Sequence, residues 1–349
     1  MATVPGGIFD VSDVSADAGA VIGDFLRTAG ITEQSFTEVT VSDGGSVSLS
    51  ADVGVASVAV ASGQTASVEL TGEAGQTVVI AGSGNASVVG SAGGDNVLGG
   101  AGSDSITGGL GDDAVSGGLG DDSVYGGIGK DTLDGGSGND TIRSDEGDDL
   151  FYGGIGDDLI GGGAANDVAY GQRDNDVIYG NTNDDLIYGN QQNDTLYGGQ
   201  NNDTVFGGQD EDLVFGNKGD DAVYGNKGDD VVFGGQGSDV VYGGQGNDTV
   251  EGNLGDDSLY GNLGSDVFAF GTGSGADIIY DFTAGADMIQ VASGVNGLSV
   301  TQASDLSARV SDDSSGNAVI DLGDGNQVTV VGVSSSDITA SISTYIEIV

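Results

Sequence analysis

A period of nine residues governs the middle of this chain and restricts its fold more than any other feature. Residues 90–269 divide into twenty consecutive nonapeptides without an insertion, for example Gly117-Gly-Leu-Gly-Asp-Asp-Ser-Val-Tyr125. Position six is Asp in all twenty, from Asp95 to Asp266, and position eight is apolar in all twenty. A repeat this regular predicts a solenoid, in which each nonapeptide is one unit stacked on its neighbours.

Each position of the nonapeptide has a physical role. An apolar residue at position eight, flanked by outward residues at seven and nine, predicts a three-residue strand with one inward side chain. Glycine at positions one, two and four permits positive φ and close backbone approach, so the other six residues form a turn. The carboxylate at position six is a hard oxygen ligand, and turn carbonyls would complete the shell of a Ca²⁺ ion.

The composition favours short strands and cations. Sixty-nine of 349 residues are Gly, a density that long helices do not tolerate. Fifty-five acidic residues face seven basic ones, a formal net charge of −48, which argues against nucleic acid or an anionic membrane as partner. The chain has no Cys and no His, so disulfides, thiol nucleophiles and His-ligated zinc are excluded. No apolar stretch is long enough to span a membrane.

The nonapeptides match GGxGxDxUx, the repeat of the RTX (repeats-in-toxin) family, and the chain is identified as a member of that family. The resemblance implies a right-handed parallel β-roll with two nonapeptides per coil and Ca²⁺ between stacked turns on both edges. It implies type I secretion to an extracellular or cell-surface location. The ending Ile346-Glu-Ile-Val349 is similar to the uncleaved C-terminal signals of this route, and no N-terminal secretory signal is visible.

The expected metal ligands are the position-six aspartates of repeats one to eight and fifteen to twenty, about ten firm sites when they are counted as same-edge pairs. They are Asp95, Asp104, Asp113, Asp122, Asp131, Asp140, Asp149, Asp158, Asp221, Asp230, Asp239, Asp248, Asp257 and Asp266. In repeats nine to fourteen, position four is not Gly; Ala165 and Gln192 are the least suited to left-handed geometry. Either this block has merely drifted, or amide side chains replace some calcium sites and it holds fewer ions.

We divide the chain into four parts. Residues 1–34 contain a predicted amphipathic helix over 16–29, and residues 35–89 form calcium-free β coils, with a small separate β-sandwich as the alternative. The roll covers 90–269. Residues 270–349 form a β-rich C-terminal cap with a predicted hairpin over 317–332.

Aromatic residues recur at position nine, every eighteenth residue along each predicted face. This pattern is common in the family, but it also predicts an exposed apolar strip large enough for contact. The residues expected to form such a contact or ligand face are Tyr152, Tyr170, Tyr188, Phe206, Tyr224 and Tyr242 on one side and Tyr179, Tyr197, Phe215 and Phe233 on the other.

Three functions compete. The first is a calcium-dependent structural protein that self-assembles into a surface layer, sheet or filament, with no catalytic role. The second is a secreted carbohydrate-binding or adhesin module that stacks sugars, such as cell-surface polysaccharide, on the aromatic face. The third is a secreted enzyme, which is disfavoured because the 89 residues before the repeats contain neither HExxH nor GxSxG.

Overall fold

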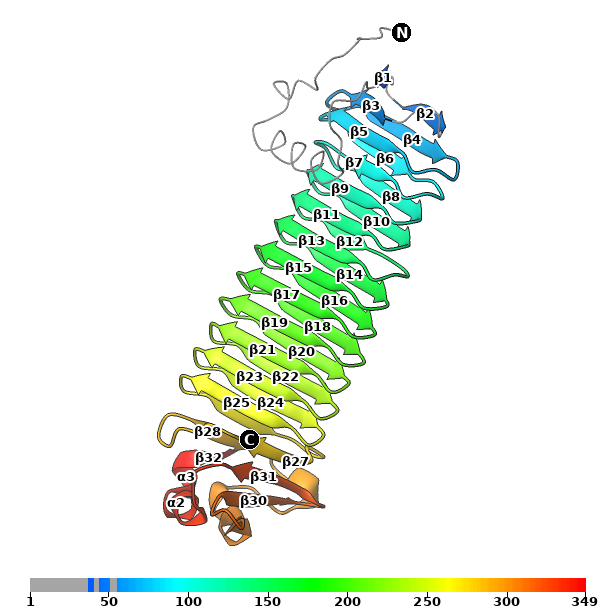
Figure 1. The fold of residues 1–349 in the computed structure, drawn as a ribbon. Coiled ribbons are helices and arrows are strands. Elements are labelled where there is room, and N and C mark those ends of the chain that lie inside the picture. The colour runs from blue at the N-terminus through cyan, green and yellow to red at the C-terminus, as the bar shows by residue number, and fades with distance from the viewer. Residues whose placement is uncertain (1–36, 41–43, 51–54) are drawn as a thin grey trace. The chain divides into compact units, whose positions relative to one another are not determined.

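The computed structural model describes residues 37–40, 44–50 and 55–349, and the helix predicted over 16–29 lies outside them. The chain divides into two compact units, Met1–Ile178 and Tyr179–Val349. Each unit is a parallel β-solenoid in which successive strands alternate between two sheets, so that a strand lies beside the strand two elements away (Figure 1). The predicted all-β parallel roll is confirmed.

In the first unit, the odd-numbered strands pair in parallel, in chain order. They are β1 (Thr37–Thr40), β3 (Val55–Val60), β5 (Thr77–Gly82), β7 (Asn96–Leu98), β9 (Ala114–Leu119), β11 (Thr132–Ser137), β13 (Leu150–Ile155) and β15 (Val168–Arg173). The even-numbered strands pair in the same way. They are β2 (Gly45–Ser50), β4 (Thr65–Thr71), β6 (Asn85–Val89), β8 (Ser105–Leu110), β10 (Ser123–Ile128), β12 (Thr141–Arg143) and β14 (Leu159–Ala164), followed by β16 (Val177–Thr182) at the boundary of the units.

The strands before the repeats belong to the same two sheets as the repeats. Strand β5 pairs with β7 and β6 pairs with β8, both in parallel. These segments are therefore coils of the same two sheets and lead directly into the roll, and the sandwich alternative does not fit this pairing.

The second unit continues the pattern and adds a cap. Its odd-numbered strands are β17 (Leu186–Gln191), β19 (Thr204–Gln209), β21 (Ala222–Lys227), β23 (Val240–Gln245), β25 (Ser258–Leu263) and β27 (Ala276–Ile279). Its even-numbered strands are β18 (Thr195–Gln200), β20 (Leu213–Lys218), β22 (Val231–Gln236), β24 (Thr249–Leu254), β26 (Val267–Phe270), β28 (Met288–Val291) and β32 (Ile346–Ile348). The last of these pairs with β28, so the chain's final residues are part of the sheet.

The C-terminal cap contains the predicted hairpin. Strands β30 (Ala318–Gly323) and β31 (Asn326–Val330) pair antiparallel, β31 pairs with β27, and β29 (Val310–Asp312) pairs with β30. The helical segments η2 (Val295–Gly297), η3 (Ala303–Arg309) and α2 (Ser335–Ala340) contact β30, whereas α3 (Ile342–Tyr345) contacts β32. Figure 1 shows α2 and α3 in this cap. None of the helices among the described residues is long and apolar enough to cross a membrane.

The strands of the repeats are longer than predicted. We expected three residues, positions seven to nine, but most strands have six and continue through positions one to three of the next nonapeptide, as in β13 and β22. The reason is that the residues at positions two and three also join the parallel ladder, as Gly136 does with Gly154 and Ser137 with Ile155. The inward residues are then position eight, which is apolar and buried, and position one.

Candidate metal centre

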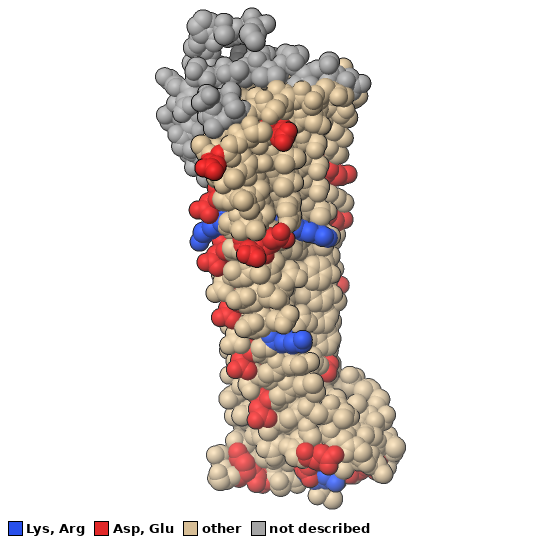
Figure 2. All heavy atoms as spheres, turned by 90° about the vertical axis from the view of Figure 1, so that its right-hand side faces the viewer, with Lys and Arg blue, Asp and Glu red and all other residues tan. Residues whose placement is uncertain are grey.

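The aspartate of position six is buried in every repeat. The exposed fraction of its side chain is between 1% and 3% from Asp95 to Asp266. Acidic side chains are consequently scattered over the face drawn in Figure 2 rather than covering it, although the chain carries 55 of them. A buried carboxylate is costly unless its oxygens have partners, so the two oxygens need separate consideration.

The first oxygen of each carboxylate is bound to backbone. Oδ1 of Asp140 accepts a hydrogen bond from the N–H of Asp122 at 2.7 Å, and Oδ1 of Asp239 accepts one from the N–H of Asp221 at 2.8 Å. The same bond recurs at an interval of eighteen residues. The carboxylate of one aspartate therefore binds the backbone N–H of the position-six aspartate one coil earlier. The sequence analysis did not anticipate this ladder, which requires no metal.

The second oxygen has no such partner. In the part of the chain that the structure describes, Oδ2 lacks a hydrogen-bond partner at many position-six aspartates. They include Asp104, Asp113, Asp122, Asp140, Asp158, Asp203, Asp212, Asp221, Asp230, Asp239, Asp248 and Asp257. An unpaired buried carboxylate oxygen is the kind of atom that a cation would satisfy.

A main-chain carbonyl lies beside this oxygen. A Cβ atom on Gly153, at position one, would lie 2.6 Å from Oδ2 of Asp158 and 2.7 Å from the carbonyl oxygen of Gly171. A Cβ on Gly225 would meet Asp230 Oδ2 and the Gly243 carbonyl, each at 2.5 Å. We call this arrangement of a position-one glycine, its position-six carboxylate and the position-one carbonyl eighteen residues on the cradle.

The donor set of the cradle fits Ca²⁺. Carboxylate and carbonyl oxygens are the ligands that this cation prefers. Nowhere among the described residues do three acidic side chains gather around one point. A site here would therefore combine one or two carboxylates with main-chain carbonyls.

Burial also changes the acidity of these carboxyls. Desolvation raises the pKa of Asp122, Asp158 and Asp203 from 3.8 to about 8, although the backbone N–H bond to each lowers it. The pKa of Asp104 and Asp239 rises to about 7 for the same reason. Without a cation, these groups therefore tend to hold a proton in the folded chain.

A second ladder runs along the exposed part of the turns. At position five, Oδ1 of Asp121 accepts from the N–H of Asn139 at 3.0 Å, and Oδ1 of Asn139 accepts from the N–H of Asp157 at 3.2 Å. It points in the opposite chain direction from the position-six ladder. Position five is Asp, Asn or Ser in most repeats, and this preference is the sequence signal of the second ladder.

Repeats nine to fourteen keep the geometry of position six. Ala165 and Gln192 adopt positive φ, 93° and 71°, in place of glycine. Their side chains are half-buried and exposed, respectively, while Asp203 and Asp212 in the same block are buried and hold the Oδ1 bond. The position-six carboxylates of this block are therefore arranged as in the other repeats. The lower calcium content expected for the block stays a prediction.

The ladder also extends past the twentieth repeat. Asp277 accepts from the N–H of Asp257, and Asp287 accepts from the N–H of Asp266, each at 3.1 Å. Both lie in the closing segment, with spacings of 20 and 21 residues in place of 18. Because these spacings break the nonapeptide period, the sequence analysis did not count them with the position-six residues.

The aromatic residues of position nine stack in columns. In the first unit, the rings of Tyr152 and Tyr170 are 5.4 Å apart. In the second unit, one column runs through Tyr179, Tyr197, Phe215 and Phe233, and the other through Tyr188, Phe206, Tyr224, Tyr242, Tyr260 and Tyr280, with ring centroids 4.5–4.9 Å apart. Most of these rings are half-buried against their neighbours, and Tyr179 and Tyr280 are 40% exposed.

The fold and the cradles define a class, the calcium-binding parallel β-rolls. Comparison with protein families identifies the particular family. The model of the RTX calcium-binding nonapeptide repeat (4 copies) matches residues 89–124, 125–160, 161–196, 179–214, 197–232, 206–241, 233–268 and 242–279. The chain therefore belongs to the RTX calcium-binding nonapeptide repeat family, as the sequence predicted, and this family binds Ca²⁺.

Among solved structures, the chain is similar to the solution structure of the AlgE6R3 subunit from the Azotobacter vinelandii mannuronan C5-epimerase. The identity is 25%, the match covers 46% of this chain and 80% of that chain, and the TM-score is 0.23. Comparison with curated proteins finds no match.

Proposed function

We propose that this protein is an extracellular structural protein that folds on binding Ca²⁺ and self-associates through its aromatic columns into a layer, sheet or filament. The observation that carries the proposal is the pair of stacked columns in the second unit. The proposal assigns no catalytic role to the chain, places it outside the cell because RTX repeats are typical of secreted proteins, and retains the four-part division of the sequence.

Calcium would be held by the cradles. The ligands would be Oδ2 of the predicted position-six aspartates together with the carbonyl oxygens of the position-one glycines, such as Asp158 with Gly171. A divalent cation supplies positive charge to buried carboxylates that otherwise favour the protonated form. Because the cradle joins residues eighteen apart, the ion would also tie each coil to the next.

Self-association is favoured by what lies beside the aromatic columns. Position seven places aliphatic side chains next to the rings, for example Leu186 beside Tyr188 and Val240 beside Tyr242. At position three, Leu254 and Leu263 are 46% and 68% exposed, and the sequence analysis did not anticipate these apolar edge residues. Bound Ca²⁺ would neutralise the buried carboxylates and so lower the electrostatic repulsion between copies of the chain. The apolar faces of two copies would then be able to come into contact.

Assembly can be tested by changing one column. We expect the combined replacement of Tyr188, Phe206 and Tyr224 by Ser to abolish large assemblies while the calcium-induced circular dichroism spectrum remains, because these rings lie outside the core. The matched control replaces the exposed Gln191, Gln209 and Lys227 on the same three strands by Ser. Light scattering and negative-stain microscopy would measure assembly. Undiminished assembly of the aromatic variant would exclude this face as the contact.

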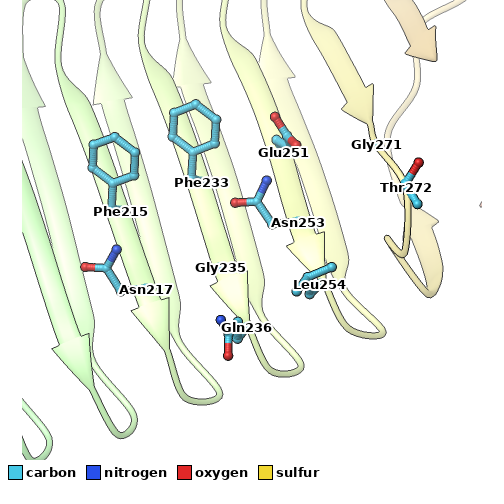
Figure 3. Close-up of a pocket in the computed structure, with 10 residues that line it drawn as sticks. All are labelled: Phe215, Asn217, Phe233, Gly235, Gln236, Glu251, Asn253, Leu254, Gly271 and Thr272. Carbon is cyan, nitrogen blue, oxygen red and sulfur yellow. The ribbon is translucent and has the colours of Figure 1, made fainter. Parts of the chain in front are cut away.

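A hollow on the even-numbered strands favours a second function, carbohydrate binding. It has a volume of about 340 Å³ and lies where the Phe215–Phe233 column meets Glu251, as Figure 3 shows. Asn217 and Asn253 also line it. Aromatic rings flanked by amide and carboxylate groups suit a saccharide, and the acidic chain would favour a neutral over an acidic one.

Binding of neutral polysaccharides can be measured by affinity electrophoresis. If the hollow binds a polysaccharide, the polysaccharide should retard the parent protein in the gel. The double variant Phe233→Ser, Glu251→Gln should migrate without retardation, whereas Tyr242→Ser, in the other column, should be retarded like the parent. Retardation of the parent together with loss in the first variant alone would favour the carbohydrate function. No retardation of the parent by any neutral polysaccharide tested would exclude it.

A further inference from the structure

One position-one residue differs from all the others. Ser144 stands at position one of repeat seven, where the remaining nineteen repeats have Gly. Its side chain is buried, with 7% exposed. A side chain at this position would collide with the position-six carboxylate in the regular coil, as the Cβ positions at Gly153 and Gly225 show, so the backbone around Ser144 has to change.

The backbone leaves the ladder at this point. Strand β10 pairs with β8 as far as Ile128, but it pairs with β12 only as far as Arg143, where β12 ends after three residues. Pairing resumes at Glu146, which bridges Ile128 on one side and Ala164 on the other. The Ser144 N–H still donates to the carbonyl of Gly161 at 3.3 Å, so the position that has lost its regular pairing is Asp145.

This change alters one cradle. Beside Gly117, a Cβ would meet the carboxylate of Asp122 and the Gly135 carbonyl at 2.7 Å, as in the regular coil. Beside Gly126, the corresponding neighbours are the carboxylate of Asp131 and the hydroxyl oxygen of Ser144, at 2.8 Å. A serine hydroxyl has taken the place of the main-chain carbonyl.

The hydroxyl also satisfies the carboxylate. Ser144 Oγ lies 3.3 Å from Oδ2 of Asp131 and 3.2 Å from the carbonyl oxygen of Gly127, and it can donate its one proton to either. The same chemistry occurs in the first repeat, where the N–H and Oγ of Ser91 donate to Oδ2 of Asp95 at 2.7 and 2.9 Å. In these two places an uncharged hydrogen-bond donor satisfies the Oδ2 atom, which has no hydrogen-bond partner in cradles such as that of Asp158.

We propose that Ser144 occupies a calcium cradle of the roll, so that the turns carrying Asp131 and Asp149 are held together by a hydroxyl in place of a metal ion. This inference rests on the proposed binding of Ca²⁺ by the other cradles. The interruption lies in repeats five to seven, which the sequence analysis assigned to the regular calcium-binding stretch, and not in the Gln- and Asn-rich block. The row of calcium cradles along one edge of the first unit is then interrupted at this turn.

Native mass spectrometry of the full chain at saturating Ca²⁺ tests the proposal. Ser144→Ala removes the hydroxyl but keeps the Cβ, and we expect it to bind as many ions as the parent. Ser144→Gly combined with Asp145→Gly restores the glycine pair of the regular repeat, and we expect it to bind at least one ion more. Gly153→Ser, which creates a side chain in a regular cradle, should bind at least one ion fewer.

Two outcomes overturn the proposal. Loss of an ion in Ser144→Ala would make the hydroxyl a calcium ligand, and an unchanged count in the double glycine variant would show that no cradle was occupied. If the parent itself bound no Ca²⁺, the proposed function would fail rather than the role of Ser144.

Hydrogen exchange supplies an independent measurement. At limiting Ca²⁺, we expect the backbone N–H groups of the turns at Asp131 and Asp149 to be protected in the parent, and Ser144→Ala to lose that protection because a buried carboxylate oxygen loses its donor. Ser123→Ala, at an exposed position of β10, is the matched control and should leave exchange unchanged. Equal protection of these turns in the parent and Ser144→Ala would count against the role of the hydroxyl.

Discussion

The position-six aspartate combines two tasks within one side chain. Oδ1 binds the backbone of the preceding coil and Oδ2 faces the cradle, so the residue contributes both to a metal-independent ladder and to the proposed calcium site. Asparagine can replace the first oxygen but not the charge of the second. The two tasks can therefore be separated by substitution.

Asp230 offers this separation. Its Oδ1 accepts from the N–H of Asp212 at 2.8 Å. We expect Asp230→Asn to lower the number of bound Ca²⁺ ions while retaining this bond, whereas Asp230→Ala should in addition destabilise the fold by about 1 to 3 kcal/mol, because a buried N–H loses its acceptor. Native mass spectrometry and denaturant unfolding would separate the effects. Equal calcium binding by the Asp230→Asn variant and the parent would remove Asp230 from the ligands.

At the scale of the element, each strand of the nonapeptide repeats contributes one inward apolar side chain at position eight. The position-eight residues are almost fully buried, including Leu196 and Val214 on the neighbouring strands β18 and β20, and the adjacent positions seven and nine face outward. One such side chain cannot form an apolar core by itself. Stability of a strand therefore depends on the strands directly above and below it.

We expect Leu196→Ala to cost about 2 to 5 kcal/mol, because it removes a fully buried side chain between fixed neighbours. Thr195→Ala, one residue earlier and half-exposed, should change stability by less than about 0.5 kcal/mol. Hydrogen exchange should show the loss first in β18 and its partner β20. A uniform loss across all strands would contradict nearest-neighbour stabilisation.

At the scale of the whole molecule, charge controls folding. Acidic residues exceed basic ones by 48, and buried position-six carboxylates form a large part of that excess. Ions that bind only the folded chain add their binding free energy to its stability. In the absence of metal, protons are the other species that can neutralise these groups.

The calcium-free protein should therefore respond to pH in the direction set by burial. The folded-state pKa of Asp122 and Asp158 is about 8, above the ordinary 3.8, so the folded chain binds more protons than the unfolded chain between these values. Stability of the calcium-free fold is then greatest below about pH 4, declines as the pH rises above that value, and is lost once the pH passes about 8. Circular dichroism of calcium-depleted protein should show β structure at pH 4.5 and little at pH 8.5.

Addition of millimolar Ca²⁺ at pH 8.5 should restore the β spectrum, and Mg²⁺ at equal ionic strength is the control for general screening. A full β spectrum in chelator at pH 8.5 and low salt would show that neither metal nor protons are needed for folding.

Much of this protein follows from its nonapeptide period alone. A constant repeat leaves only one register between neighbouring coils. This register determines where each coil lies, which apolar residue faces inward, and which rings stack, such as Tyr197 on Phe215. The hairpin of β30 and β31 followed from local turn chemistry. Family membership and Ca²⁺ binding likewise follow from the motif.

Other features required the tertiary structure. Four features depend on how atoms of different coils meet in space. They are the six-residue strands, the Oδ1 ladder, the hydroxyl of Ser144 in the cradle of Asp131, and the hollow beside Glu251. The sequence shows which residues face each other across eighteen positions, but not which oxygen of a carboxylate turns to the backbone. That choice is decided by packing, because burial leaves each polar atom dependent on the few partners within its reach.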